Sequence, residues 1–379
     1  MIVRQFLRWV QTAAPGERAE ATSALARAFL YSDLSEEDRL AAEAAMTVLL
    51  DDPSPLVRSA LAQALSGSPD APHGVILALA QDQPEIAAVV AARSPMLSDA
   101  DLVDLAGAGD ESLQSAIAAR EPLSRAVAGA IAEVGSPAAC LVLIENTMAE
   151  TSMKAFARIA ERHGQLSAIR EALFAREDLP AETRQALVAK LSDTLVRFVT
   201  ERNWLPEDRV QRVAREACDR ATIAIAAGKD ADEISVLVRH LVSSGQLTSL
   251  LLLRALLCGH VRFLIEAFAE LSGLAPERVA SVIHDRHTHG FRALYDRAGL
   301  PDAAFGAFRA VLEALHEIGF VGDGLGAANL KRRMVERVLT IYAGSDEGEI
   351  DYLFAMLRRF AAEASREEAR FYTADLVAA

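Results

Sequence analysis

His284, His287 and His289 form the one group of side chains in the sequence that is dense enough to suggest metal binding. Histidines three residues apart can share one helix face, and imidazole nitrogen is a common zinc ligand. The segment contributes no cysteine and a single adjacent carboxylate, that of Asp285. We therefore expect a solvated helix end without a metal, while metal binding by the three histidines stays open as the alternative.

Two further motifs point to cofactor chemistry but are incomplete. Glu313 and His316 have the i, i+3 spacing of a diiron bundle, which requires a second such pair that the sequence lacks. The segment GDGLGAAN, residues 322–329, has glycines at 322, 324 and 326, whereas a dinucleotide-binding turn needs the order GxGxxG after a strand. We predict a surface pair and an inter-helix loop, and we assign no catalytic residue, cofactor or metal.

Basic side chains at helical spacing form the candidate interaction surface. One set lies at i, i+4 and i+8 and another at i, i+3 and i+6, so each set can share a helix face. A further pair ends the segments VVAAR and AIAAR, where an arginine can bond terminal carbonyl groups; a shallow recognition strip is the alternative. Interspersed acidic residues favour solvated, salt-linked faces, and docking of an acidic partner or a phosphate-bearing ligand is the other interpretation. The residues are Lys154, Arg158 and Arg162, then Arg209, Arg212 and Arg215, and the pair Arg93 and Arg120.

The segments that carry most of these residues repeat along the chain. VRSALAQALSGSP, IAAVVAARSPMLS, LQSAIAAREPLS and CLVLIENTMAET begin at Val57, Ile86, Leu113 and Cys140, with offsets of 29, 27 and 27 residues. Each unit has room for two short helices and two turns, and residues 97–107 supply the intervening helix in one of them. A single helix pair leaves an apolar face uncovered, so neighbouring pairs must stack.

The segment DDPSPLVRSALAQAL, residues 51–65, resembles the second-helix signature of HEAT repeats, an Asp-Pro turn followed by Val-Arg and small residues. In the next two units the position of Arg58 is taken by Ala87 and Gln114, so we do not expect an uninterrupted aspartate–arginine ladder. The whole chain is also similar to an uncharacterised, mainly alphaproteobacterial family that joins such a repeat to a further helical segment. That resemblance implies no activity. The residues that match the HEAT signature are Asp52, Pro53, Val57 and Arg58.

The pattern predicts an all-α fold in two domains. No run alternates polar and apolar residues long enough to indicate a strand. We expect an N-terminal α-solenoid of HEAT-like helix pairs over residues 1–204, followed by a smaller, irregular all-helical domain over 205–379, where glycines separate helices of differing length. The apolar first segment, which includes Phe6 and Trp9, is expected to cap the solenoid, with a membrane-surface helix as the alternative.

Composition narrows the classes of function and location. The net charge is −14, and residues 1–150 carry 9 basic and 21 acidic side chains. Such a surface repels phosphate backbones and disfavours general nucleic-acid binding. Three separated cysteines, charges in every long apolar stretch and a start unlike a signal peptide predict a cytoplasmic protein without a transmembrane segment. Only 4 lysines against 35 arginines, with abundant alanine, indicate a GC-rich bacterial genome.

We therefore expect a non-enzymatic interaction or scaffold protein, with a regulatory role open, that binds a protein partner through the solenoid surface. A nucleic-acid-processing enzyme of the HEAT-like glycosylase type is one alternative. A nucleotide or second-messenger sensor that uses the arginine sets is another. The sequence leaves the partner's identity and any self-association of the chain open.

Overall fold

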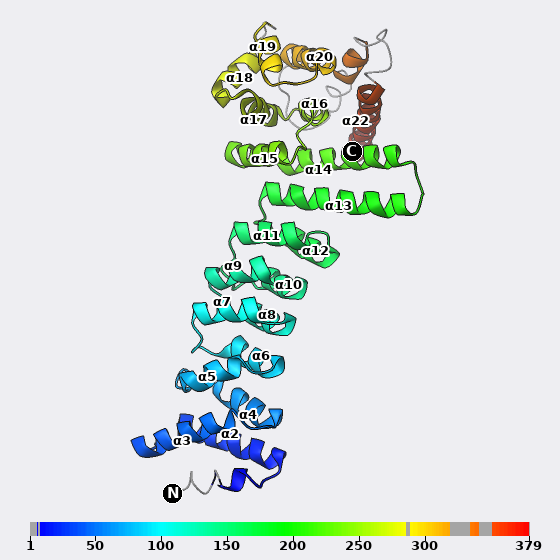
Figure 1. The fold of residues 1–379 in the computed structure, drawn as a ribbon. Coiled ribbons are helices and arrows are strands. Elements are labelled where there is room, and N and C mark those ends of the chain that lie inside the picture. Colours follow the sequence, from blue (N-terminus) through cyan, green and yellow to red (C-terminus); the bar gives the residue numbers. More distant parts are fainter. Residues whose placement is uncertain (1–5, 7, 286–288, 319–333, 341–350, 379) are drawn as a thin grey trace. The chain divides into compact units, whose positions relative to one another are not determined.

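The computed structural model describes residues 6, 8–285, 289–318, 334–340 and 351–378. The chain divides into two compact units, an N-terminal unit of residues 1–179 and a C-terminal unit of residues 180–379 (Figure 1). Helices build both units. Among the residues described there is no strand, and one isolated β-bridge joins Leu123 and Ala149. The predicted all-α class is confirmed.

The chain divides between residues 179 and 180, which is 25 residues before the predicted boundary at 204/205. Helix α13 (Ala181–Glu201) packs on α14 (Glu207–Ala226) as a long hairpin and also contacts α15 (Ala231–Ser243) (Figure 1). Its apolar positions are therefore covered by helices that follow it. The sequence of α13 continues the amphipathic pattern of the repeats, which is why the pattern alone did not locate the boundary.

Most helices of the N-terminal unit stack in two layers. We call α2, α4, α6, α8, α10 and α12 the even layer, because each packs on the next, and α7, α9 and α11 the odd layer, in which the same holds. The helices are α2 (Pro15–Tyr31), α3 (Glu36–Leu49), α4 (Pro55–Leu65), α5 (His73–Ala80), α6 (Pro84–Arg93), α7 (Asp99–Ala108), α8 (Glu111–Ala118), α9 (Arg125–Val134), α10 (Pro137–Glu145), α11 (Met153–His163) and α12 (Ser167–Ala175).

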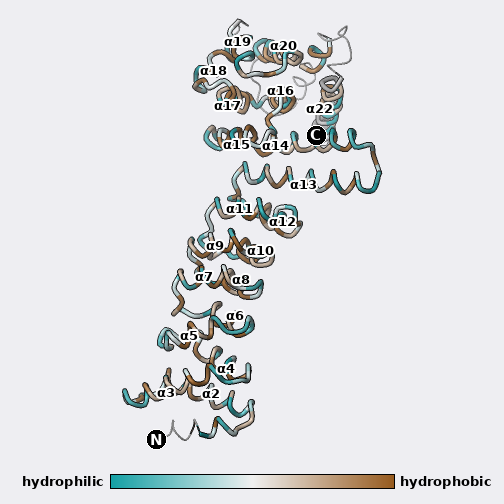
Figure 2. The backbone as a smooth tube through the Cα atoms, viewed as in Figure 1, coloured by the Kyte–Doolittle hydropathy of each residue, from teal (hydrophilic) through white to brown (hydrophobic). Residues whose placement is uncertain are grey.

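Equivalent positions of the even layer fill the core between the helices. Val57, Ile86 and Leu113 are each the third residue of their helix and are buried, as the repeat alignment predicts. In α10 the third residue is Ala139, so Cys140 stands one position beyond the predicted register, in the place of Arg58. Small and branched apolar side chains at such positions let the helices approach closely. Figure 2 shows hydrophobic positions recurring in each helix of this unit.

Turn residues start the repeat helices as their types suggest. Ser98, the predicted cap, accepts a hydrogen bond from the Asp101 amide and begins α7 with a capping box. Asp110 accepts from the Leu113 amide in the same way at α8. The Asp52 carboxylate accepts a hydrogen bond from the Ser54 amide in the turn before α4. These bonds satisfy amides that have no partner within their helix.

The C-terminal unit surrounds one apolar core. Helices α16 and α17, joined at Gly259, lie at its centre, and the rings of Phe268, Tyr295 and Phe308 meet there at centroid distances of 5.5–6.3 Å. Besides α13–α15 the helices are α16 (Ser249–Leu257), α17 (Val261–Ser272), α18 (Pro276–His284), α19 (His289–Arg297), α20 (Asp302–Ile318), the helical residues 334–340 and α22 (Asp351–Ala378).

Candidate functional site

A recurrent bond in the even layer uses a side chain of one repeat to complete the helix end of the repeat before it. Arg120 donates to the carbonyls of Ala91 and Ser94 at the end of α6. The Asn146 amide, at the equivalent position after α10, donates to the carbonyls of Ala118 and Arg120 at 2.9 and 2.8 Å. Arg176 donates to the Ile144 carbonyl at 3.1 Å after α12. The last carbonyls of a helix have no partner within it, so these side chains hold successive repeats together.

The odd layer contains the same device. Arg162 donates to the carbonyls of Ala132 and Gly135 at 2.9 and 3.0 Å, at the end of α9. Arg93, the predicted counterpart of Arg120, is exposed, and its guanidinium has no hydrogen bond or ion pair with any residue described. The structural role proposed for the pair therefore applies to Arg120 and not to Arg93.

Two rungs of an aspartate–arginine ladder join the first even-layer helices. Arg18 of α2 donates two bonds of 2.8 Å to the carboxylate of Asp52. Arg58 of α4 donates to Asp82 at 2.6 and 3.0 Å and to the Asp52 carbonyl at 2.6 Å. The ladder then changes chemistry, as Gln114 donates to the Ala106 carbonyl and accepts from the Ser136 amide. An uninterrupted ladder was not expected, and two ionic rungs followed by an amide bridge are what the structure contains.

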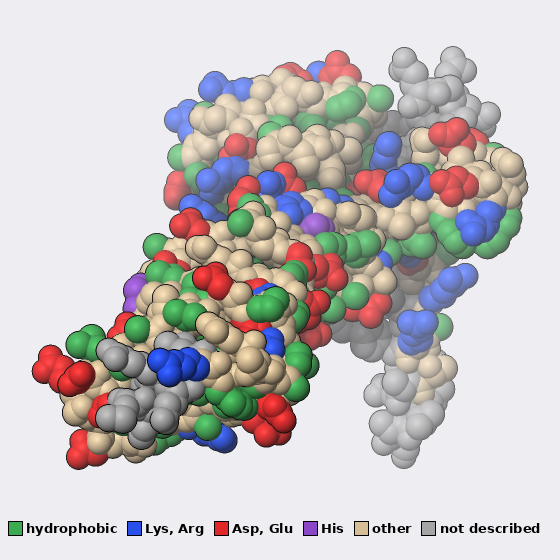
Figure 3. All heavy atoms as spheres, turned by 60° about the horizontal axis from the view of Figure 1, so that its bottom comes forward, with side chains coloured by type: hydrophobic (Ala, Val, Ile, Leu, Met, Phe, Trp, Pro, Cys, Tyr) green, Lys and Arg blue, Asp and Glu red, His purple; other side chains and the backbone are tan. Residues whose placement is uncertain are grey.

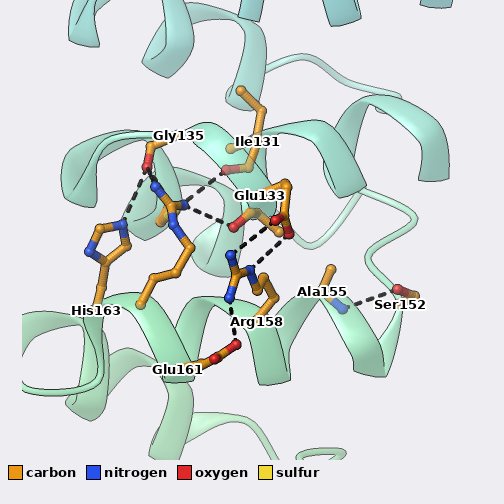
Figure 4. A network of polar contacts seen from close by, with 11 residues as sticks. Ile131, Glu133, Gly135, Ser152, Ala155, Arg158, Glu161 and His163 are labelled. Atoms are coloured by element: carbon orange, nitrogen blue, oxygen red, sulfur yellow. Dashed lines mark hydrogen bonds and ion pairs between the residues drawn. The ribbon is translucent and has the colours of Figure 1, made fainter. Parts of the chain in front are cut away.

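A surface network engages most of the predicted stripe on α11 (Figure 4). Arg158 lies between two carboxylates, donating to Glu133 at 2.8 and 3.0 Å and to Glu161 at 2.6 Å. These bonds, with the attraction of both carboxylates, raise the pKa of Arg158. Lys154 is exposed, and the described residues offer it no hydrogen bond or ion pair. In the set Lys154, Arg158 and Arg162, only the lysine keeps its charge free for a partner.

A groove of about 620 Å³ lies within the C-terminal unit, between α13, α14, α15 and α16. Gln185 is one of its lining residues and is fully buried; its carbonyl oxygen lies 3.0 Å from His240 Nε2, and its amide donates to Gln246. Burial raises the pKa of the Cys218 thiol and lowers that of His240. A high thiol pKa disfavours the nucleophilic thiolate, so this arrangement does not activate Cys218.

Among the ionisable groups that line the groove, Asp219 has a strongly shifted pKa. Burial raises its pKa to about 6, and the charges of Arg254 and Arg215 oppose that shift. Of the predicted set on α14, Arg215 lines this groove with Asp219, whereas Arg209 and Arg212 line a separate hollow. The structure therefore does not bring the three arginines together.

The residues considered as metal or cofactor motifs have other partners or lie outside the residues that the structure describes. The Nδ1 atom of His284 is 2.7 Å from the Ala280 carbonyl, and within the described ranges no three metal-binding side chains gather. His287, the side chain of His289 and the glycines of 322–329 lie outside the residues described. Glu313 pairs with Arg309 at 3.5 Å, while His316 Nε2 contacts the Ile283 carbonyl at 2.9 Å.

The family of the chain follows from a sequence comparison. A family model described as "Uncharacterised protein conserved in bacteria (DUF2336)" matches residues 86–347. The chain belongs to this family. No curated protein and no solved structure matches it. The DUF2336 match begins within α6, so it includes Arg120, Asn146, Arg162 and Arg176 but not the two ionic rungs that precede it.

The sequence did not lead us to several residues that join neighbouring helices in the structure. Arg18 repeats the Pro-x-x-Arg spacing of Arg58 forty residues earlier, a signal that was present in the sequence. Asn146 and Arg176 stand seven residues after the first buried position of their helices, as Arg120 does, but their side chains differ in type. The predicted capping segment around Phe6 and Trp9 lies mostly outside the residues described. None of the helices described is both long and apolar enough to cross a membrane.

Proposed function

We propose that this DUF2336 protein is a non-enzymatic scaffold that binds a protein partner along the N-terminal unit, in the cytoplasm. The proposal rests on a contrast between two groups of side chains in that unit: polar ones that are bonded within the chain and apolar ones that are exposed. Those that join the repeats, such as Arg58, Arg120 and Arg162, are engaged within the chain. Large apolar side chains meanwhile remain exposed, and exposed apolar surface rimmed by charge is typical of interaction sites.

The clearest such surface is a stripe on α3, which we call the α3 stripe: Leu40, Ala44 and Val48. Residues at i, i+4 and i+8 share one helix face. Leu40 is 63% exposed and Val48 58% exposed. Burying two such side chains under a partner would stabilise a complex by about 2–4 kcal/mol before the cost of association.

Charge indicates the chemistry of that partner. Residues 1–179 carry 14 basic and 25 acidic side chains, a net charge of −11. The first turn of α3 itself contributes Glu36, Glu37 and Asp38, and Figure 3 shows acidic side chains over the face of the N-terminal unit in view. Complementary charge accelerates association and selects partners. The surface fits a partner segment that combines apolar and basic side chains.

The two alternative functions have less support. A glycosylase-type enzyme would need aromatic side chains beside a carboxylate in a basic groove. The lining of the 620 Å³ groove includes two carboxylates, Asp193 and Asp219, with one arginine, Arg215, and no aromatic residue is among the side chains described as lining it. A sensor that uses Arg209, Arg212 and Arg215 together would need them at one site, and they line two.

Affinity capture from a bacterial lysate, read by quantitative mass spectrometry, tests the scaffold. The full chain is compared with Val48→Glu in the α3 stripe and with the matched control Val242→Glu on α15, where the valine is 38% exposed. We expect at least one protein that is captured by wild type and by the control but lost with Val48→Glu, and that binds the purified chain directly. If every captured protein binds all three forms equally, the α3 stripe is not the binding surface.

A further inference from the structure

An open hollow in the C-terminal unit brings together two arginines of α14 and a third that is distant in sequence. Its volume is about 390 Å³, and its lining consists of Arg209, Arg212 and Val213 from α14 and Arg359 from α22. No carboxylate is among the lining residues described. Arg359 follows Arg212 by 147 residues, so the fold and not a local motif creates this group.

The three guanidinium groups retain capacity for a ligand. The Arg209 side chain is exposed and has no hydrogen bond or ion pair with the residues described. Arg212 uses one nitrogen on Asp208 at 2.9 Å, and Arg359 uses one on Glu216 at 2.6 Å. A guanidinium has five N–H donors, so most donors of all three arginines are unused.

The local charge favours an anion. Three guanidiniums face two carboxylates, and the Asp208 side chain is 74% exposed to solvent, where its charge is well screened. Glu216 is held away from solvent, with its side chain 11% exposed, and its backbone carbonyl accepts from Arg254 at 3.4 Å. The hollow therefore presents an excess of donors and positive charge beside a single apolar contact, that of Val213.

We propose that this hollow binds the phosphate group of a phosphomonoester. A phosphate carries two negative charges near neutral pH and accepts hydrogen bonds on three oxygens, which matches a fork of arginine donors. Because Val213 is the one apolar side chain in the lining described, the phosphate and not its carrier supplies the recognition. The site is independent of the scaffold function proposed above.

Binding would also tie α22 to α14. Helix α22 already contacts α14 through the ion pairs Arg359–Glu216 and Arg220–Glu363, at 2.6 and 2.8 Å. A ligand that contacts Arg209 and Arg359 adds a bridge between the same two helices. Hydrogen exchange of residues 355–363 should therefore slow when the site is filled.

Isothermal titration calorimetry of the full chain at low salt tests the site with inorganic phosphate, glycerol 3-phosphate and adenosine 5′-monophosphate as probes. We expect saturable binding that weakens roughly 10-fold in Arg209→Ala and in Arg359→Ala, the loss typical of one charged hydrogen-bonding group. The control is Arg215→Ala, next in the helical stripe but in the other groove; its affinity should stay within about 2-fold. Because the Arg209 side chain is exposed and makes no hydrogen bond or ion pair with the residues described, Arg209→Ala removes no such bond from the fold.

A vesicle arm separates the sources of the phosphate. Phosphatidylcholine vesicles with and without phosphatidic acid are sedimented with the chain. If the chain binds only the vesicles that contain phosphatidic acid, and Arg209→Ala abolishes this binding, the phosphate belongs to a lipid headgroup. If the chain binds the soluble probes, the phosphate belongs to a free metabolite. The proposal is overturned if no probe binds in either arm, or if Arg215→Ala weakens binding as much as Arg209→Ala.

Discussion

The Arg58–Asp82 rung should contribute measurably to the stability of the N-terminal unit. The two side chains are only 16% and 14% exposed, and the guanidinium makes bonds of 2.6 and 3.0 Å to the carboxylate. Exposed pairs contribute up to about 1 kcal/mol, and loss of one partner of a buried pair costs about 3–5 kcal/mol. For this partly buried pair we expect a coupling energy of about 2 kcal/mol, which is roughly a 30-fold change in the unfolding equilibrium.

A double-mutant cycle measures that energy. Arg58→Ala, Asp82→Ala and the double variant are compared with wild type by urea and thermal denaturation of the full chain, followed by a signal from the N-terminal unit. Each single variant should lower the melting temperature of that unit by about 4–8 °C. The matched control is the cycle of Arg158 and Glu133, a bidentate pair of similar length whose side chains are 38% and 58% exposed. Its coupling should be much smaller, because solvent screens it.

The pH dependence provides a second check. Burial opposes ionisation of Asp82, but hydrogen bonds from Arg58 and the Gln83 amide outweigh it and lower the pKa of this carboxyl. A lowered folded-state pKa means that the stabilisation is fully present above the unfolded value of about 4 and is lost as pH falls through the folded value. A coupling at neutral pH no larger than that of Arg158–Glu133, or one that persists once Asp82 is protonated, would refute this reasoning.

Three further predictions follow from buried groups. Because burial raises the pKa of Asp219 to about 6, its ionised form opposes folding, so stability should rise as pH falls from 7 towards the unfolded pKa near 4; Asp219→Asn should remove this dependence and stabilise the chain at pH 7.5 by up to about 2 kcal/mol in thermal melts. Burial raises the pKa of the Cys140 thiol, whose side chain is 0% exposed, so mass spectrometry should find it alkylated by iodoacetamide only after unfolding; labelling of the native chain would contradict the packing. Phe156 is 0% exposed beneath the Arg176 guanidinium, and Phe156→Ala should cost about 3–5 kcal/mol in urea denaturation, against less than half of that for Phe156→Leu.

The repeat was predictable because the same position of each successive helix is buried. Val57, Ile86 and Leu113 occupy one structural position, and a helix that must cover its neighbour requires an apolar residue there each time. The register at Cys140 was not predictable, because α10 begins 26 residues after α8, whereas α8 begins 27 residues after α6, and both Ala139 and Cys140 are small enough to be buried. Composition could not choose between them.

The candidate surface was only partly predictable, because helical spacing describes one helix and not what packs beside it. Each residue turns the helix by about 100°, so Arg215 lies about 120° around α14 from Arg209 and faces a different groove. Arg359, on another helix, lines the same hollow as Arg209, and the spacing of residues within one helix could not predict this. Arg120 bonds carbonyls at a helix end, as we predicted, but these carbonyls belong to the helix of the preceding repeat and not to its own.

The bonds from Arg120, Asn146, Arg162 and Arg176 run in one direction along the chain, each reaching back to an earlier helix. During synthesis on the ribosome, the ends of α6, α8, α9 and α10 therefore stay incomplete until the residues that bond them have been translated. Growth from the N-terminus would consolidate each repeat one step late, so a chain cut short at its C-terminal side should suffer more than one shortened at the start.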